Sequence, residues 1–178
     1  MLKKKQEKIM EETKATPALE SGLADDMVGI KGWLILVAIG VVIAPFRLIA
    51  FMLSTYPELF TTGTWQSLTS QFGDYYHPYW EPLLLSEMLF NTLITLASLY
   101  LIVLFFKKKA QFPKWYIGIA VSSLIFIVAD AFAIRMIIPD APVFDGETRL
   151  EIIRGVLTVA IWVPYMLISE RVKATFVR

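Results

Sequence analysis

Four long apolar runs constrain this chain more than any other feature. They cover about residues 32–53, 83–106, 115–138 and 150–168. A helix rises about 1.5 Å per residue, so each run is long enough, or nearly so, to cross a hydrocarbon core about 30 Å thick. The sequence therefore predicts an all-α, polytopic membrane protein with four transmembrane helices in a bundle.

The composition supports this fold class and excludes several kinds of site. Hydrophobic residues make up 56% of the chain, charged residues only 19%, and the mean hydropathy is +0.58, whereas soluble domains are nearer half apolar with more charge. The chain has no cysteine, which excludes disulfides, thiol catalysis and cysteine-based metal sites. Its single histidine excludes a multi-histidine metal site within one chain.

The chain divides into a polar tail and a membrane domain. Residues 1–28 mix lysines with glutamates, and we expect them to form a flexible cytoplasmic tail. They do not resemble a cleavable signal peptide, because the segment before the first apolar run is long and acidic as well as basic. Residues 29–178 form the predicted four-helix transmembrane domain.

The connection between the first two apolar runs, residues 54–82, is long and aromatic. It contains no Lys or Arg, and its rings suit a membrane–water interface. We expect a short surface helix near residues 65–72. A connection of this length is a candidate lid or binding loop. The residues proposed for this lid or interface are Trp65, Tyr76, His77, Tyr79 and Trp80.

The distribution of basic residues predicts the orientation. Six Lys precede residue 32, four lie in the 107–114 turn and three Lys or Arg lie in the C-terminal tail, whereas the 54–82 and 139–148 connections before Arg149 have none. The positive-inside rule then places both termini in the cytoplasm and both long connections outside. The 54–82 loop is therefore expected to be extracytoplasmic.

Each predicted span carries a polar or charged residue in its outer half, at an expected depth of about 6–12 Å. A charge placed in a span costs at least about 2.5–3.5 kcal/mol on insertion scales, so pairing or hydration is expected. On the second span, Glu87, Asn91, Thr95 and Ser98 recur on one helical face, which must turn toward the bundle. The candidate cluster consists of Arg47, Glu87, Asn91, Asp130 and Arg154.

Two hypotheses fit this cluster. In the first, it lines a water-accessible cavity, open to the outside and covered by the aromatic loop, that binds a small polar solute or a lipid head group. In the second, the charges form an ion-pair network that fixes the helix register of a structural or regulatory membrane protein. Arg47 and Arg154 balance two carboxylates, Glu87 and Asp130, and this formal neutrality favours the second hypothesis.

No motif indicates catalysis, a cofactor or a metal. The chain lacks a G-x-S-x-G pattern, and His77 with Asp74 and Glu81 matches no metal-ligand signature. No phosphate-binding loop, dinucleotide fingerprint or nucleic-acid patch is present. We therefore expect a protein that is not an enzyme. Its expected partners are the lipid bilayer, a lipid or small polar ligand, and a membrane protein or further copies of the chain, because four helices are few for a transporter.

Two stretches also carry a resemblance to a known family. The first is Tyr76–Leu83, followed by Glu87 and Asn91; the second runs from Trp162-x-Pro-Tyr to Arg-Val-Lys-x-Thr-Phe176. Over about residues 29–178 the chain resembles the bacterial inner-membrane family catalogued as domain of unknown function 2569. The resemblance implies a bacterial, four-helix inner-membrane protein, and it brings no established activity.

Overall fold

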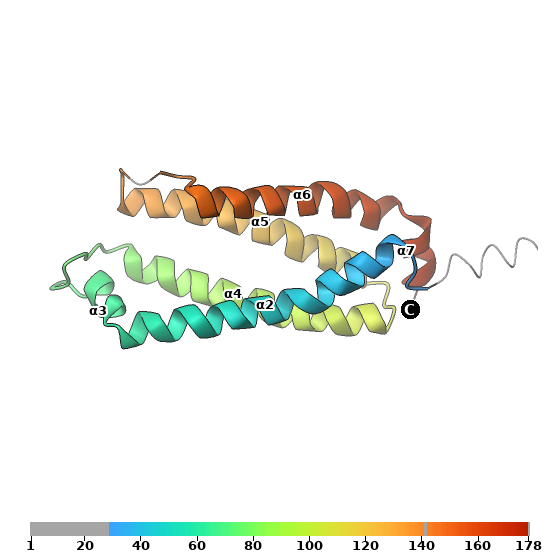
Figure 1. The fold of residues 1–178 in the computed structure, drawn as a ribbon, viewed down its shortest axis with the longest axis horizontal. Helices are drawn as coiled ribbons and strands as arrows, with labels where there is room; N and C mark the ends of the chain where they lie inside the picture. Colours follow the sequence, from blue (N-terminus) through green and yellow to red (C-terminus); the bar gives the residue numbers. More distant parts are fainter. Residues whose placement is uncertain (1–28, 141, 178) are drawn as a thin grey trace, which may run out of the picture.

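The computed structural model describes residues 29–140 and 142–177, and this part of the chain is helical, with no strand. The predicted tail of residues 1–28 lies outside the described residues. In chain order the helices are α2 (Trp33–Thr61), α3 (Thr64–Thr69), α4 (Trp80–Phe106), α5 (Phe112–Ile137), α6 (Gly146–Ile168) and α7 (Glu170–Thr175) (Figure 1). Four of them, α2, α4, α5 and α6, are long and apolar enough to cross a membrane. The predicted all-α membrane fold with four long helices is confirmed.

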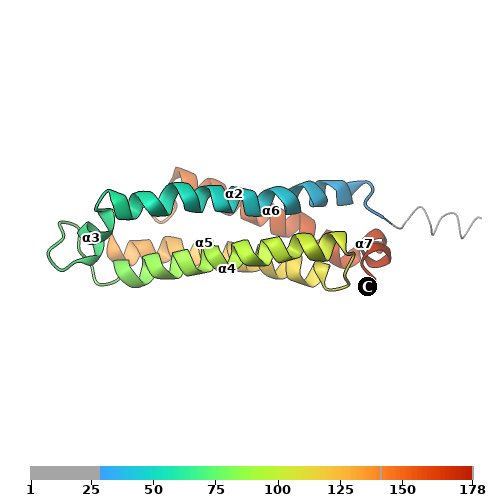
Figure 2. The ribbon, with the colours of Figure 1, turned by 90° about the horizontal axis from the view of Figure 1, so that it is seen from below.

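The four long helices pack in the order α2, α4, α5, α6. Figures 1 and 2 show them running along one long axis, with α3 at one end and α7 at the other. In Figure 1, α2 and α6 are widely separated toward the α3 end, and α2 slants toward α6 at the α7 end. There Trp33 of α2 meets Trp162 of α6 edge to face at 6.3 Å. The bundle is therefore closed at the α7 end and splayed at the α3 end.

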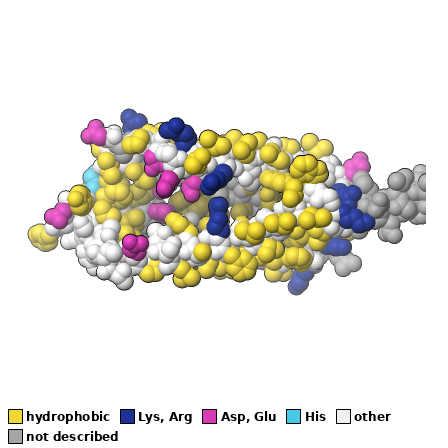
Figure 3. All heavy atoms as spheres, viewed as in Figure 1, with side chains coloured by type: hydrophobic (Ala, Val, Ile, Leu, Met, Phe, Trp, Pro, Cys, Tyr) yellow, Lys and Arg dark blue, Asp and Glu magenta, His cyan; other side chains and the backbone are white. Residues whose placement is uncertain are grey.

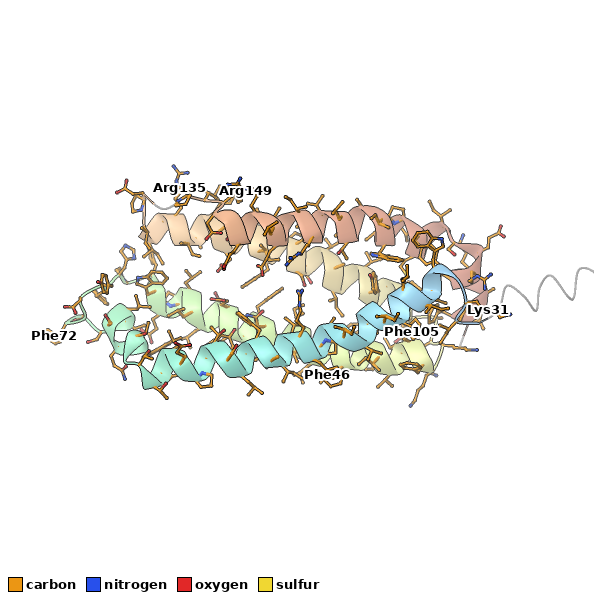
Figure 4. All side chains as sticks on the ribbon, in the orientation of Figure 1. Lys31, Phe46, Phe72, Phe105, Arg135 and Arg149 are labelled. Atoms are coloured by element: carbon orange, nitrogen blue, oxygen red, sulfur yellow. The ribbon has the colours of Figure 1, made fainter. Side chains whose placement is uncertain are left out.

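An aromatic core holds the α7 end together. The Phe105 ring of α4 lies 5.0 Å from the Phe112 ring of α5, and Phe112 stacks on Phe176 at 4.5 Å. All three rings are buried, and Figure 4 places Phe105 among the helix ends. The Gly29 backbone N–H donates to the Thr175 hydroxyl at 3.1 Å. The last helix thus joins both ends of the described chain to the core.

Helix α2 is longer than predicted. It continues through Pro57 to Thr61, and α4 begins at Trp80, so the connection between them is residues 62–79 instead of 54–82. The hydroxyls of Thr61 and Thr62 donate to the carbonyls of residues 57 and 58 at 2.9 and 2.7 Å. The Thr62 backbone N–H donates to the Glu58 carbonyl as well, at 3.0 Å, so these hydroxyls add to the hydrogen bonding of the last turn. The extension also brings Tyr56 into the helix.

Helix α6 begins at a defined cap. The Asp145 carboxylate accepts a hydrogen bond from the Thr148 backbone N–H at 2.7 Å. This bond holds the pKa of the Asp145 carboxyl below its usual value. A lowered folded-state pKa means that the cap contributes stability at neutral pH and loses it as the pH falls through that value.

Helices α5 and α6 approach closely at Gly155. A Cβ atom added there would lie 3.0 Å from Cδ1 of Leu124 on α5. We expect Gly155→Leu to force these helices apart and to lower the free energy of unfolding by about 1–3 kcal/mol, the usual range for overpacking. Unfolding in mixed micelles would measure it. Gly40→Leu is the matched control, because an added Cβ there meets nothing within 4 Å. Equal effects from both substitutions would contradict this packing.

Candidate functional site

The polar stripe of α4 faces the bundle, as its spacing predicts. Thr95 and Ser98 are buried, and Glu87 and Asn91 are half-buried. The Asn91 side-chain amide donates to the Tyr56 hydroxyl of α2 at 2.8 Å. The Thr95 hydroxyl donates to the Asn91 carbonyl at 2.7 Å. The stripe therefore joins α4 to α2, and the sequence reasoning missed Tyr56 because it placed this residue in a loop.

We expect Tyr56→Phe to remove this interhelical hydrogen bond and leave the Asn91 amide short of a partner. Hydrogen bonds between membrane helices contribute roughly 0.6–2 kcal/mol, so the free energy of unfolding should fall by about that amount. Tyr75→Phe is the control, because Tyr75 is exposed in the connection. Unchanged stability in Tyr56→Phe would show that the bond contributes nothing measurable.

Two further carboxylates lie within electrostatic range of Glu87, which belongs to this stripe. Glu87 of α4 lies within electrostatic range of Asp130 on α5 and Glu151 on α6. The cluster predicted from the sequence did not include Glu151. Its position three residues before Arg154 was the available signal, because residues at this spacing share a helical face. The structure thus adds an acidic residue to the candidate cluster.

The charges are not paired as expected. Within residues 29–140 and 142–177, no ion pair joins Arg47 or Arg154 to Glu87 or Asp130. The Oδ1 atom of Asp130 is buried without a hydrogen-bond partner. The carboxylates do not converge closely enough to make a three-ligand metal site in the described part of the chain. The expected ion-pair network between these four residues is therefore absent from the described part of the chain.

Arg47 lies further from the α3 end than predicted. At about 1.5 Å per residue it is roughly 21 Å from the last residue of α2, whereas Glu87 and Asp130 are roughly 10 Å from the corresponding ends of α4 and α5. The cause is the extension of α2 to Thr61. Figure 3 shows acidic side chains gathered around a hollow in this face, with Lys or Arg side chains beside them toward the middle of the molecule.

The predicted lid residues lie at the α3 end. Trp65 is on α3, its ring 5.1 Å from that of Phe60, and the His77 and Tyr79 rings lie 5.2 Å apart. Trp80 begins α4, and Tyr76 is exposed just before it. Among the described residues, no hydrogen bond or ring contact joins these five to the charged cluster. The five predicted lid residues therefore lie together at the α3 end of the α2–α4 helix pair.

The comparison with known proteins decides the family. The family described as "Protein of unknown function (DUF2569)" matches residues 27–177. This chain belongs to that family. A relative named "Inner membrane protein YdgK", from Escherichia coli strain K12, is 32% identical over 154 residues, which are 85% of this chain and 90% of the relative. No solved structure matches the chain. The family match and the four apolar helices make it a membrane protein.

Proposed function

We propose that the protein lies in the bacterial inner membrane with both termini in the cytoplasm. The name of the Escherichia coli relative supports the location. The basic residues support the orientation, because Lys107, Lys108 and Lys109 lie in the short α4–α5 turn at the α7 end and Lys114 lies in the first turn of α5 beside it. Such residues are enriched on the cytoplasmic side. The splayed α3 end then opens toward the periplasm.

Within this orientation, the hollow between α2–α4 and α5–α6 binds a small polar solute or a lipid head group, without chemical conversion. One observation carries the proposal. Charges of both signs surround the hollow and, in the part of the chain that the structure describes, form no ion pairs with one another, while Asp130 has a buried oxygen without a partner. A buried polar atom left unpaired costs about 1–3 kcal/mol. A ligand entering the hollow would supply that partner.

The ligand that fits best carries an ammonium group and an acidic group. Asp130 and Glu151 lie within electrostatic range of Glu87, and together these carboxylates attract an ammonium. Arg47 and Arg154 are exposed and have no carboxylate partner in the described structure, so their guanidinium groups are available to a phosphate or carboxylate. Phosphoethanolamine has both groups, either free or as the head group of phosphatidylethanolamine, and is the probe of choice.

Cysteine labelling tests whether the hollow is open. The chain has no cysteine, so single substitutions at Glu87, Asn91, Asp130 and Arg154 report only their own position. We expect an impermeant thiol reagent, applied from the periplasmic side, to label all four positions. Phosphoethanolamine should protect Asn91→Cys, because this variant keeps the charged side chains of the hollow. Leu89→Cys is the control, because Leu89 is an exposed apolar residue of α4 between Glu87 and Asn91. Absence of labelling at all four positions would eliminate the cavity.

A second candidate function is that of an accessory protein with a membrane partner. The observation that favours it is the tip of the 62–79 connection, where Phe72 is 98% exposed (Figure 4). A photoreactive amino acid at position 72 distinguishes the two surroundings of this ring. A crosslinked protein of defined mass supports the accessory role, whereas lipid adducts alone support a simple interfacial anchor.

A further inference from the structure

A second, apolar groove lies between α4 and α5, and it does not include the charged cluster. It encloses about 750 Å³, within the usual range for small-molecule sites. Its walls come from residues 90–100 of α4 and residues 114–122 of α5. The Ser122 hydroxyl donates to the Ile119 carbonyl of its own helix at 3.1 Å. That hydroxyl therefore has a partner already, and the middle of the groove suits hydrocarbon.

Aromatic pairs mark the two ends of this groove. At the deep end, the Phe90 ring stacks on Phe126 of α5 at 3.8 Å. At the other end, toward α7, Tyr100 meets Trp115 edge to face at 5.2 Å, and Lys114 also lines the groove. Tyrosine and tryptophan favour the level of the lipid head groups, and lysine reaches toward it. The groove is therefore closed by aromatic rings at its deep end, within the hydrocarbon core. At its mouth, toward α7, it carries a positive charge.

The length of the groove matches one leaflet. From Phe90 to Tyr100, at about 1.5 Å per residue, it extends roughly 15 Å along α4, half of a hydrocarbon core about 30 Å thick. Its mouth adjoins the basic turn that contains Lys107, Lys108 and Lys109, which increases the positive charge there. An acyl chain with a negative head group satisfies the shape, the depth and the charge together.

We propose that the α4–α5 groove binds one anionic phospholipid from the leaflet at the α7 end, with an acyl chain between the helices and the phosphate beside Lys114. This site is separate from the polar hollow and does not depend on the function proposed for it. Gly118 makes the groove possible, because a Cβ atom added there meets nothing within 4 Å. A larger side chain at this position would fill the space instead of clashing with a neighbour.

Native mass spectrometry of the full chain, taken from nanodiscs containing equal amounts of phosphatidylglycerol and phosphatidylcholine, tests this site. We expect the wild type to retain one phosphatidylglycerol. Gly118→Leu should reduce its retention at least tenfold, and Gly40→Leu should leave it unchanged. Lys114→Gln should lower the preference for phosphatidylglycerol about fivefold, the effect of one basic residue near anionic lipid, and Lys109→Gln, outside the groove, should lower it less.

Two results would overturn the proposal. One is equal retention of phosphatidylglycerol and phosphatidylcholine by the wild type, with no change in Gly118→Leu. The other is a wild-type dimer that Gly118→Leu converts to a monomer without loss of lipid, because the groove would then be covered by a second copy of the chain. Labelling of Asn91→Cys in the Gly118→Leu background checks the fold and the polar hollow separately. The extent of labelling should equal that of Asn91→Cys alone, whether or not Gly118→Leu loses the lipid.

Discussion

Replacing Phe105 by alanine is expected to lower the free energy of unfolding by about 3–5 kcal/mol, the range for removing a large aromatic side chain from a packed core. Phe105 is 0% exposed, and its ring contacts those of Phe112 and Phe176. Lipid is as apolar as these rings, so the effect comes from lost van der Waals packing between protein groups. Among the residues that the structure describes, the α3 end has no buried aromatic ring that could compensate.

Phe106→Ala is the matched control for this substitution. Phe106 is the next residue of α4 and is 56% exposed, so its removal leaves no cavity among the helices. Equilibrium unfolding of both variants in mixed micelles should show a difference of at least about 2 kcal/mol. Similar losses in the two variants would mean that the α7 end is not the stabilising core of the bundle.

The membrane architecture is readable from the sequence, because four apolar runs can hardly be accommodated in any other way. The inward face of α4 is readable too, since Thr95 and Ser98 recur at helical spacing and both are buried. Helix ends are harder. Pro57 and two threonines look like a loop, yet the hydroxyls of Thr61 and Thr62 complete the last turn of α2. The longer α2 therefore includes Tyr56.

Which charges pair was not readable from the sequence. Depth along a span gives one coordinate, whereas an ion pair also requires the right helix rotation, tilt and side-chain direction. Arg47 was expected level with Glu87, and the longer α2 places it about 10 Å further along. Glu151 was not part of the predicted cluster, and it lies within electrostatic range of Glu87. The predicted cluster was neutral, whereas Glu151 adds a third carboxylate to it. The charge count also did not predict how the charges are arranged.

The arrangement of the charges leads to a second large expected effect. Asp130→Asn should weaken phosphoethanolamine binding at least about tenfold, because losing one partner of a desolvated charge pair usually costs 2–5 kcal/mol or more. Its effect on the free energy of unfolding without ligand should stay within about 1 kcal/mol, because Asp130 has no ion pair to lose. Asp74→Asn, in the exposed connection, is the matched control and should change neither quantity.

These two measurements separate the binding site from a helix lock. Breaking a buried ion pair by removing one partner typically costs about 3–5 kcal/mol. A stability loss of that size in Asp130→Asn, with phosphoethanolamine binding absent from the wild type as well, would establish the lock. Arg154→Gln provides an independent check from the opposite charge. A binding site predicts weaker phosphoethanolamine binding at nearly unchanged stability, whereas a lock predicts the same large destabilisation as for Asp130.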